Sequence, residues 1–344
     1  MIARLPSSVA TVAIALLSTT LLSAQAPAPK AELVSVEKIW DKGAHNAFTD
    51  ITRYQNLFYC AFREADGDAG KNGVIRIMLS ASGKTWIDNG TVSESGVDLR
   101  DPKLVVTPDE KRVYLLCSGL VYEGGQVKSR RSRYATTLDG KVWTPMQKLL
   151  NEGETLSRAS VNPADKRFYG AVFNIHPNSG GPAPEKEYSL KTFASADGSV
   201  WQLNSIMNVP GQPNDTTVRF LKNGTAMALV KRDAVDKRGV IGTAQPPYRE
   251  WTWASAGVPL GGPNFIELPD GRLIAGSRGF GATPGPHMVL FAMSATGLAP
   301  ILELPSGGDC SYPGFYWHDD LLHVTYYSSH EGKPSIYYAR VKVQ

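Results

Sequence analysis

The chain alternates short apolar segments with short polar ones along almost its whole length. Residues 103–117 read KLVVTPDEKRVYLLC, and residues 265–275 read FIELPDGRLIA. In each segment two runs of apolar and β-branched residues flank a turn that contains Pro, Asp or Gly, which is typical of a β-hairpin. Outside the N-terminus, no long stretch repeats apolar residues at the 3.6-residue spacing of an amphipathic helix. The pattern therefore predicts an all-β protein.

A turn segment that ends in tryptophan recurs at a nearly fixed interval. Residues 80–86 (SASGKTW), 137–143 (TLDGKVW) and 195–201 (SADGSVW) share it, with tryptophans 57 and 58 residues apart, and residues 243–251 are a degenerate fourth copy. Each copy is interpreted as a turn between outer strands. Asp or Ser closes the turn through its side chain, Gly adopts positive φ, and Trp packs between neighbouring units. The recurrence indicates a repeated structural unit.

A strand-turn-strand unit recurs in a second phase, and its spacing sets the size of the repeat. A unit of this length holds roughly four strands of five or six residues, the size of one β-propeller blade. Solenoid repeats are usually shorter or helical. We therefore predict a single six-bladed β-propeller over residues 27–344, with residues 31–40 able to supply the outer strand of the last blade. The units open near Asn46, Asp101, Ala159, Asp215, Asn264 and Tyr312.

The N-terminus has the order of a secretory signal peptide. Arg4 precedes an apolar stretch over residues 9–22, and the small residues Ser-Ala-Gln-Ala follow before Pro27. The apolar stretch is too short and too polar to span a bilayer comfortably. We therefore expect residues 1–26 to be removed and the mature protein to be secreted or periplasmic, without stable membrane insertion.

Charge and cysteine content exclude several classes of partner. The 36 basic and 32 acidic residues are interspersed, and the densest basic cluster, residues 128–133, is interpreted as a solvated loop, so nucleic acid is not an expected partner. The three cysteines are expected to be buried thiols, with a Cys60–Cys117 bridge as the alternative. No Cys or His spacing matches a zinc site, and residues 66–73 resemble a calcium loop without its closing Glu. We expect neither a metal nor a cofactor.

The predicted propeller indicates where chemistry would take place. The inner strand of each blade lines the central channel, and residues at its start, with those that close the second strand, face the channel mouth. An unpaired charge beside apolar strand residues is costly, so pairs such as Arg100 with Asp101 account for some of these charges. The excess of arginines predicts a bound carboxylate. The mouth positions are His45, Asn46, Arg63, Glu64, Asp66, Asp68, Arg100, Asp101, Arg158, Asp215, Arg232, Arg278 and Tyr312.

With these residues in place, the chain resembles the sialidase (neuraminidase) superfamily, whose six-bladed propellers carry Asp boxes like the Trp-containing turns. The sharpest match is the segment Asp-Cys-Ser-Tyr that ends at Tyr312, which implies that this tyrosine is the nucleophile. Arg232 and Arg278 look like the second and third arginines of the family's carboxylate-binding triad. Asp215 falls where the family has the glutamate that polarises the tyrosine, and it is one methylene shorter.

The first blade departs from the family pattern. Sialidases supply the first triad arginine from a Phe/Tyr-Arg-Ile-Pro segment, whereas residues 45–50 here read HNAFTD. Arg63, at the end of the following strand, could reach the same pocket. The next loop carries Glu64, Asp66 and Asp68, and the resemblance implies that one of them is the acid/base carboxylate. We favour Asp66.

The residue types fit this chemistry. A substrate with a carboxylate at its anomeric carbon would repel an anionic nucleophile, and a neutral tyrosine avoids this repulsion. A free phenol has a pKa near 10, so it needs a carboxylate such as Asp215 to accept its proton. Nearby arginines would favour the phenolate.

We therefore expect a monomeric exo-glycosidase of sialidase type that releases a terminal acidic sugar with retention. Alternatives are a glycosidase or lyase acting on uronate-containing polysaccharide, and a non-catalytic propeller that binds anionic glycans. His330 and Glu331 in the last blade are expected either to contact a sugar hydroxyl or to close a turn, and His176 is a weaker candidate for the pocket.

Overall fold

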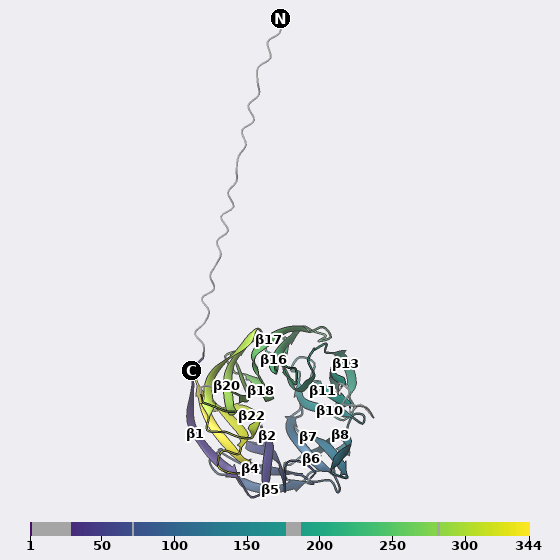
Figure 1. Cartoon of the computed structure of the whole chain (residues 1–344), viewed down its shortest axis with the longest axis vertical. Coiled ribbons are helices and arrows are strands. Elements are labelled where there is room, and N and C mark those ends of the chain that lie inside the picture. The colour runs from purple at the N-terminus through teal and green to yellow at the C-terminus, as the bar shows by residue number, and fades with distance from the viewer. Residues whose placement is uncertain (2–28, 71, 177–186, 281–282) are drawn as a thin grey trace.

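Six four-stranded antiparallel sheets surround a central channel in the computed structural model (Figure 1). The structure describes residues 1, 29–70, 72–176, 187–280 and 283–344, so the predicted signal peptide lies outside the described residues apart from Met1. Every regular element in the described ranges is a strand. Accordingly, the described residues contain no helix that is long and apolar enough to cross a membrane. The all-β, six-bladed prediction is confirmed.

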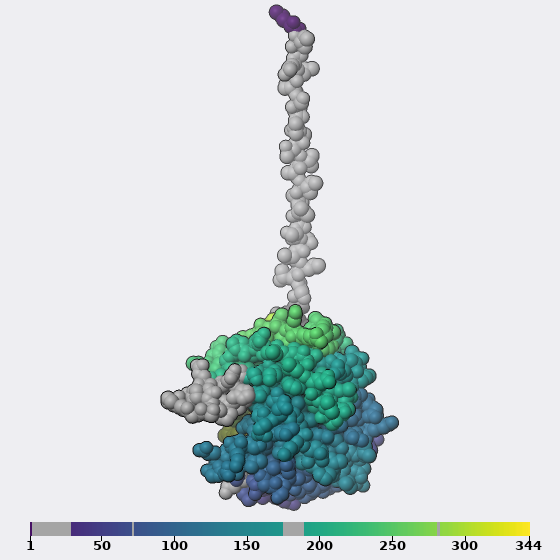
Figure 2. Space-filling view, turned by 90° about the vertical axis from the view of Figure 1, so that its right-hand side faces the viewer, coloured from purple at the N-terminus to yellow at the C-terminus, as the bar shows by residue number. Residues whose placement is uncertain are grey.

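The first three blades follow one another along the chain, and each begins with its inner strand. Their outer surfaces, blue to teal, occupy much of the side view (Figure 2). The first blade contains β2 (His45–Tyr54), β3 (Leu57–Ala65), β4 (Val74–Ser80) and β5 (Ile87–Val92). The second contains β6 (Asp98–Val106), β7 (Val113–Glu123), β8 (Gln126–Thr137) and β9 (Gln147–Lys148). The third contains β10 (Glu154–Val161), β11 (Phe168–His176), β12 (Glu187–Ser195) and β13 (Gln202–Ile206).

The last three blades complete the ring. The fourth contains β14 (Pro213–Phe220), β15 (Ala226–Arg232), β16 (Arg238–Ala244) and β17 (Thr252–Pro259). The fifth contains β18 (Gly261–Glu267), β19 (Leu273–Gly279), β20 (His287–Ser294) and β21 (Gly297–Leu304). The sixth contains β22 (Cys310–His318), β23 (Leu321–Ser328), β24 (Ser335–Val343) and β1 (Ala31–Trp40).

Strand β1 closes the ring from the other end of the chain. It pairs antiparallel with β24, from Ala31 opposite Val343 to Trp40 opposite Ile336. Figure 1 shows purple β1 against the yellow sixth blade. Closure through the N-terminal strand covers what would otherwise be an exposed sheet edge. The expectation that residues 31–40 supply this outer strand is confirmed.

The Trp-containing turns connect the third and fourth strands of the first three blades, as predicted. In each turn a Ser or Thr hydroxyl accepts a hydrogen bond from the glycine N–H three residues later, and the glycine has φ between 70° and 84°. A Cβ at this glycine would collide with a tyrosine of the preceding blade, so the position excludes a side chain for two reasons. The glycine–tyrosine contacts are Gly83–Tyr338, Gly140–Tyr59 and Gly198–Tyr114.

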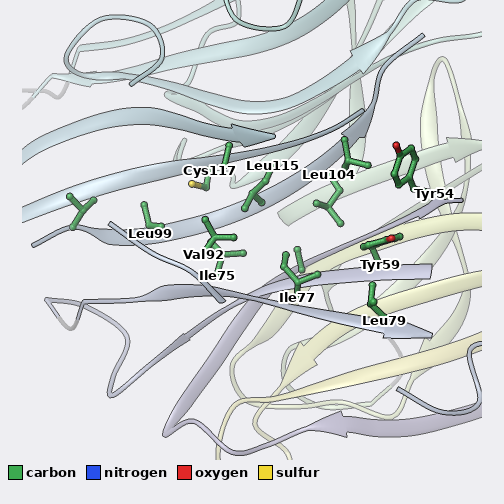
Figure 3. Packing of buried hydrophobic residues seen from close by; sticks show 14 residues of the cluster. Tyr54, Tyr59, Ile75, Ile77, Leu79, Val92, Leu99, Leu104, Leu115 and Cys117 are labelled. Atoms are coloured by element: carbon green, nitrogen blue, oxygen red, sulfur yellow. The ribbon is translucent and has the colours of Figure 1, made fainter. Parts of the chain in front are cut away.

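The hydrophobic core lies mainly between adjacent blades. In the cluster of Figure 3, Ile75 and Ile77 of the first blade pack with Leu99 and Leu115 of the second, and all four are fully buried. Blade packing of this kind stabilises the fold through apolar burial. The three cysteines are also buried and free, so the expectation of buried thiols is confirmed and the Cys60–Cys117 bridge is absent.

Each of the six inner strands carries a one-residue β-bulge at the same place in its pairing with the second strand. The extra residue bends the strand and turns side chains at this level toward the channel mouth. Four residues in the bulges have positive φ, namely Phe48, Asp101, Gly262 and Tyr312. The bulges lie between Ala47 and Asp50, Arg100 and Lys103, Leu156 and Ala159, Pro213 and Thr216, Gly261 and Asn264, and Ser311 and Gly314.

Candidate active site

A cavity of about 440 Å³ occupies one end of the central channel, which we call the front cavity. It is lined by the first halves of the inner strands, at and before the bulges, and by the ends of the second strands. Its lining is polar and rich in charge. The charged and phenolic residues that line it are Asp68, Arg100, Asp101, Tyr122, Arg130, Asp215, Lys231, Asp233, Arg278, Asp309, Tyr312 and Tyr327.

A tyrosine–aspartate pair joins two inner strands of this cavity. The hydroxyl of Tyr312 in β22 donates a hydrogen bond of 2.8 Å to Oδ2 of Asp215 in β14. The bulge holds Tyr312 at φ 52°, and the edge of the Phe48 ring packs against it with centroids 4.9 Å apart. Positive φ is uncommon for a bulky residue, so the fold fixes this side chain in an unusual conformation. The two residues predicted as nucleophile and proton acceptor are in contact.

The phenol of Tyr312 is neutral in the resting site. Burial raises its pKa well above the usual value, and the carboxylates of Asp215 and Asp101 raise it further. The expectation that nearby arginines favour the phenolate is therefore wrong, because burial and the two carboxylates shift the pKa upward. Loss of the phenolic proton requires a base within hydrogen-bonding reach, and Asp215 occupies that position.

Asp101 is a half-buried carboxylate that lines the same cavity as this pair. Burial raises its pKa, with a further increase from Asp215, while Lys103 and Arg100 oppose the shift. Its Oδ1 is buried and has no hydrogen-bond partner among the described residues. Such an atom is costly to leave unpaired, and a ligand hydroxyl would satisfy it.

Of the three candidate acid/base carboxylates, Asp68 lines the front cavity, whereas Asp66 and Glu64 do not. Asp66 is exposed, and Glu64 pairs with Arg76 at 2.5 Å. Asp68 bonds to Arg100 at 3.0 Å. Burial acts to raise the pKa of Asp68, but the hydrogen bond and charge of Arg100 outweigh it, and the pKa is lowered. Asp66, which we favoured as the acid/base residue, therefore lies outside the cavity, and Asp68 is the loop carboxylate that lines it.

Most cations of the cavity are already paired with carboxylates. Arg278 lies 3.4 Å from Asp309, and Lys231 lies 3.7 Å from both Asp215 and Asp233. Arg100 is bound to Asp68, so three of the four cations that line the cavity have carboxylate partners. The lining therefore does not have the expected excess of unpaired arginines. The exception is a residue that the sequence analysis assigned to a solvated loop.

Arg130 lies on strand β8 and lines the front cavity. Among the described residues, no acidic side chain lies within ion-pair distance of its guanidinium, although its positive charge acts on Asp101. The cluster 128–133 is therefore part of a strand rather than a loop. Strand alternation could have indicated this, because it separates neighbouring arginines onto opposite faces.

Arg63 has a different role from the one expected. It is 0% exposed, and its Nε donates to Oδ1 of Asp98 at 2.8 Å. Its Nη1 donates to the carbonyl of Gly67 and lies 3.3 Å from Nδ1 of His45. Arg63 does not line the cavity, so its side chain holds the first-blade loop in place instead of supplying the missing triad arginine.

Arg232 also lies outside the cavity lining. Its guanidinium bonds both carboxylate oxygens of Asp236 at 3.0 Å and the carbonyls of Pro210 and Arg238. These contacts stabilise the connection after β15. The preceding residue, Lys231, lines the cavity in its place. Successive side chains of a strand point to opposite faces, so this assignment was wrong by one residue.

Three other predicted contacts lie beside the cavity or away from it. Arg158 pairs with Asp50 at 2.9 Å and lines a second cavity further along the channel. Glu331 pairs with Lys38 of β1 at 2.9 Å, so it ties the closing strand to the sixth blade. His45 does not line the cavity, but its Nε2 is 3.8 Å from Asp68, and burial followed by the charge of Arg63 lowers its pKa.

The remaining histidines add nothing to the described site. His330 bonds to Ser328 at 2.9 Å and packs against the Tyr337 ring, which fits the expected turn closure. The side chain of His176 lies outside the described part of the structure. No group of three His, Cys, Asp or Glu side chains among the described residues is arranged to hold a metal ion.

Two polar contacts that the sequence analysis missed complete the rim. Tyr327 donates to Oδ1 of Asp309 at 2.9 Å, and Asn214 donates to Oδ2 of Asp233 at 2.7 Å. Both pairs connect neighbouring strand ends. Their positions in the sequence could have indicated them. Asp309 and Asn214 lie within three positions of Tyr312 and Asp215, and Tyr327 and Asp233 lie at or just after the end of a second strand.

Comparison with known proteins supports the fold. No family model matches the chain, and no curated protein sequence matches it. Among solved structures, a protein of unknown function from Dyadobacter fermentans has a TM-score of 0.80 and 17% identity, covering 92% of this chain and 100% of its own. A Trypanosoma rangeli sialidase in complex with sialic acid has a TM-score of 0.68 and 12% identity. That match covers 91% of this chain and 59% of the sialidase.

An α-L-arabinofuranosidase from Fusarium graminearum is similar to the same degree. A point mutant of that enzyme, in complex with an iminosugar inhibitor, has a TM-score of 0.68 and 13% identity, covering 90% of this chain and 98% of the enzyme. At these identities the likeness establishes the fold alone. The chain is thus a six-bladed propeller of the architecture shared by these two glycosidases.

Proposed function

We propose that the protein is a glycosidase that releases a terminal acidic sugar with retention, using Tyr312 as nucleophile and Asp215 as its base. The observation that carries the proposal is the 2.8 Å hydrogen bond from the Tyr312 hydroxyl to Asp215 in a cavity at the channel mouth. A phenol with a raised pKa needs a carboxylate partner in order to attack carbon.

The reaction takes two displacements. In the first, Tyr312 Oη forms a bond to the anomeric carbon while its proton passes to Asp215, and the bond to the leaving oxygen breaks as a general acid protonates that oxygen. In the second, water attacks the anomeric carbon of the glycosyl-tyrosine and the bond from that carbon to Tyr312 Oη breaks. The acid, now a base, takes the proton of the water, and the proton on Asp215 returns to the phenol. Each step conserves charge within the site.

Asp68 is the proposed acid/base residue. Its side chain is 68% exposed at the rim, where the leaving group of an exo-acting enzyme meets solvent. Arg100 lowers its pKa in the free protein, so we propose that substrate binding displaces this contact before proton transfer. Asp101, which lines the same cavity and has an unpaired oxygen, would bind a sugar hydroxyl.

Arg130 is proposed to bind the substrate carboxylate, together with Arg278. Arg130 is free of carboxylate partners in the described part of the chain, and a guanidinium matches a carboxylate with two parallel hydrogen bonds. A neutral nucleophile is suited to such a substrate, because it does not repel the charge beside the reacting carbon.

A neutral sugar is the second candidate substrate. The pairing of Arg100, Lys231 and Arg278 with Asp68, Asp215 and Asp309 favours it, since paired cations have less need of a ligand charge. The likeness to an arabinofuranosidase is compatible with this alternative.

The test is hydrolysis of 4-methylumbelliferyl glycosides by the purified protein, with an α-sialoside, uronides and an α-L-arabinofuranoside in one panel. Wild type is compared with Tyr312→Phe and with Tyr134→Phe, a matched control outside the cavity. Turnover of an acidic sugar that Tyr312→Phe abolishes supports the proposal. Turnover of the arabinofuranoside alone supports the second candidate. No turnover by folded protein, with retained binding of anionic glycans, would indicate a glycan-binding propeller.

A further inference from the structure

A second cavity of about 360 Å³ lies at the other end of the central channel. Every blade has four antiparallel strands, so all six inner strands run in the same direction through the ring. The front cavity is lined at and before the bulges, whereas the second cavity is lined by the six inner strands beyond them and by Arg158 in the bulge of β10. We call it the rear cavity. Two arginines of adjacent blades, Arg158 of β10 and Arg219 of β14, line it.

Neither guanidinium has a full set of hydrogen-bond partners. Arg158 is 7% exposed and donates through Nη1 to Oδ1 of Asp50 at 2.9 Å. Arg219 donates through Nη2 to Oδ1 of Asn264 at 3.1 Å. The Nε of each arginine is buried and has no partner among the described residues. Buried N–H groups of a charged side chain are rarely left unpaired, so these atoms call for an acceptor.

The nearby carboxylate does not compensate both charges. Asp50 binds Arg158 through Oδ1, and its Oδ2 accepts the backbone N–H of Leu104 at 2.8 Å. Burial, followed by repulsion from Arg158, lowers the pKa of Arg219 to about 9, with Asp50 the only opposing charge. At neutral pH the Arg219 guanidinium is therefore still charged, and Asp50, which already binds Arg158, is the carboxylate that acts on it.

Other charged groups do not remove this excess. Glu267 lines the outer part of the rear cavity, where its Oε2 accepts the backbone N–H of Lys222 at 2.9 Å, and it is not among the charges that act on Arg219. Lys103 is buried next to Arg158, and burial, followed by the charge of Arg158, lowers the pKa of its ammonium group, so it does not supply a counter-charge. Its Nζ is occupied by the carbonyls of Asp101 and Pro102.

We propose that the rear cavity is a binding site for a small oxyanion, such as phosphate or a carboxylate, held between Arg158 and Arg219. A planar guanidinium binds an oxyanion through two parallel N–H groups, and the unpaired Nε atoms are the donors available for this. The anion balances the charge that Asp50 leaves uncompensated and connects the third and fourth blades. The site is separate from the front cavity and independent of the proposed hydrolysis.

Inorganic phosphate is the probe for the test, with bromide as the second probe. Calorimetric titration of the wild-type protein with phosphate is expected to show one saturable site, and Arg219→Gln is expected to weaken binding roughly tenfold or more. Arg272→Gln, on an exposed turn beside Asp270, is the matched control and retains wild-type affinity. If phosphate bound in the front cavity instead, Arg130→Gln and not Arg219→Gln would weaken it, and that result would overturn the proposal.

A crystal grown with bromide and then with phosphate locates the anion without a variant. Density for either ion within hydrogen-bonding distance of Arg158 and Arg219 supports the proposal, and phosphate without bromide identifies an oxyanion site. If Arg219→Gln fails to fold, Arg219→Lys, which keeps the charge but not the fork, replaces it and is expected to weaken phosphate binding. An empty rear cavity at saturating phosphate, or equal affinity in all variants, overturns the proposal.

Discussion

The hydroxyl of Tyr312 and the carboxylate of Asp215 lie 2.8 Å apart although 97 positions separate the two residues in the chain. Each occupies the bulge of an inner strand, in the sixth and the fourth blade. The contact exists because the propeller brings equivalent positions of different blades to one mouth. Tyr312 is neutral there, and Asp215 is placed to take its proton.

Removing either partner is expected to lower the rate of catalysis strongly while leaving the fold intact. Loss of a general base typically costs about 10²–10⁴-fold in rate, so Asp215→Asn should lower kcat/KM by this amount and Tyr312→Phe by at least as much. The free energy of unfolding should change by only about 1 kcal/mol, the usual contribution of one hydrogen bond. Hydrolysis kinetics and urea unfolding measure the two effects. Wild-type kcat in Tyr312→Phe would rule out the tyrosine mechanism.

Arg130 and its neighbour Arg131 provide a matched pair of variants on β8. A hydrogen bond to a charged group contributes about 1.5–3 kcal/mol, so Arg130→Gln should lower kcat/KM for an acidic substrate by about 10- to 100-fold. Arg131→Gln, whose side chain does not line the cavity, should retain wild-type kinetics. On a neutral glycoside, the two variants should have the same kcat/KM. Equal kinetics of both variants on the acidic substrate would show that Arg130 does not bind its carboxylate.

The pair formed by Arg63 and Asp98 is expected to act on stability. Their side chains are 0% and 1% exposed, and removal of Arg63 leaves Asp98 buried without its closest cation, since Arg100 lies 3.5 Å away. Arg63→Met should therefore lower the free energy of unfolding by about 3–5 kcal/mol. The double variant Arg63→Met/Asp98→Leu should recover part of this loss. Urea unfolding of the single and double variants measures both, and a loss no larger than that of an exposed ion pair would contradict the structural role.

His323 is expected to make stability depend on pH. Burial lowers its pKa to about 4 from an ordinary value of 6.5, against the opposing effect of the His318 carbonyl. Between pH 6.5 and 4 the unfolded chain therefore binds a proton that the folded protein does not, so stability falls as the pH is lowered through this window. At pH 7 and above the penalty is absent.

The measurement is Tm from pH 7 to pH 4 for wild type and His323→Gln. The Tm of the wild type should decrease by more than the Tm of the variant between pH 7 and pH 4, because the variant has no buried imidazole at position 323 to protonate. His330→Gln, on the turn after β23, controls for the loss of a histidine elsewhere. Parallel curves for wild type and His323→Gln would show that the buried imidazole does not carry the effect.

Most of the architecture was readable from the sequence by itself. Alternating apolar and polar runs, turn residues and the Trp-containing turns are short-range features, and short-range sterics and hydrogen bonding decide strands and turns. The repetition of these features predicted the number of blades. The pattern of residues 31–40 predicted the closing strand. The pairing of Tyr312 with Asp215 was expected from the family resemblance, and both residues stand at the same phase of the repeat.

The allocation of charges was decided only by the tertiary structure. A shift of one residue along a strand moves a side chain to the other face, and it separates Lys231 in the cavity from Arg232 outside it. Asp98 pairs with Arg63 and Asp50 pairs with Arg158, each from another blade. A local sequence pattern therefore does not predict these partners. The sequence thus determined the blades and the residues near the channel, whereas packing between blades decided which charges are paired, which face the front cavity and which face the rear.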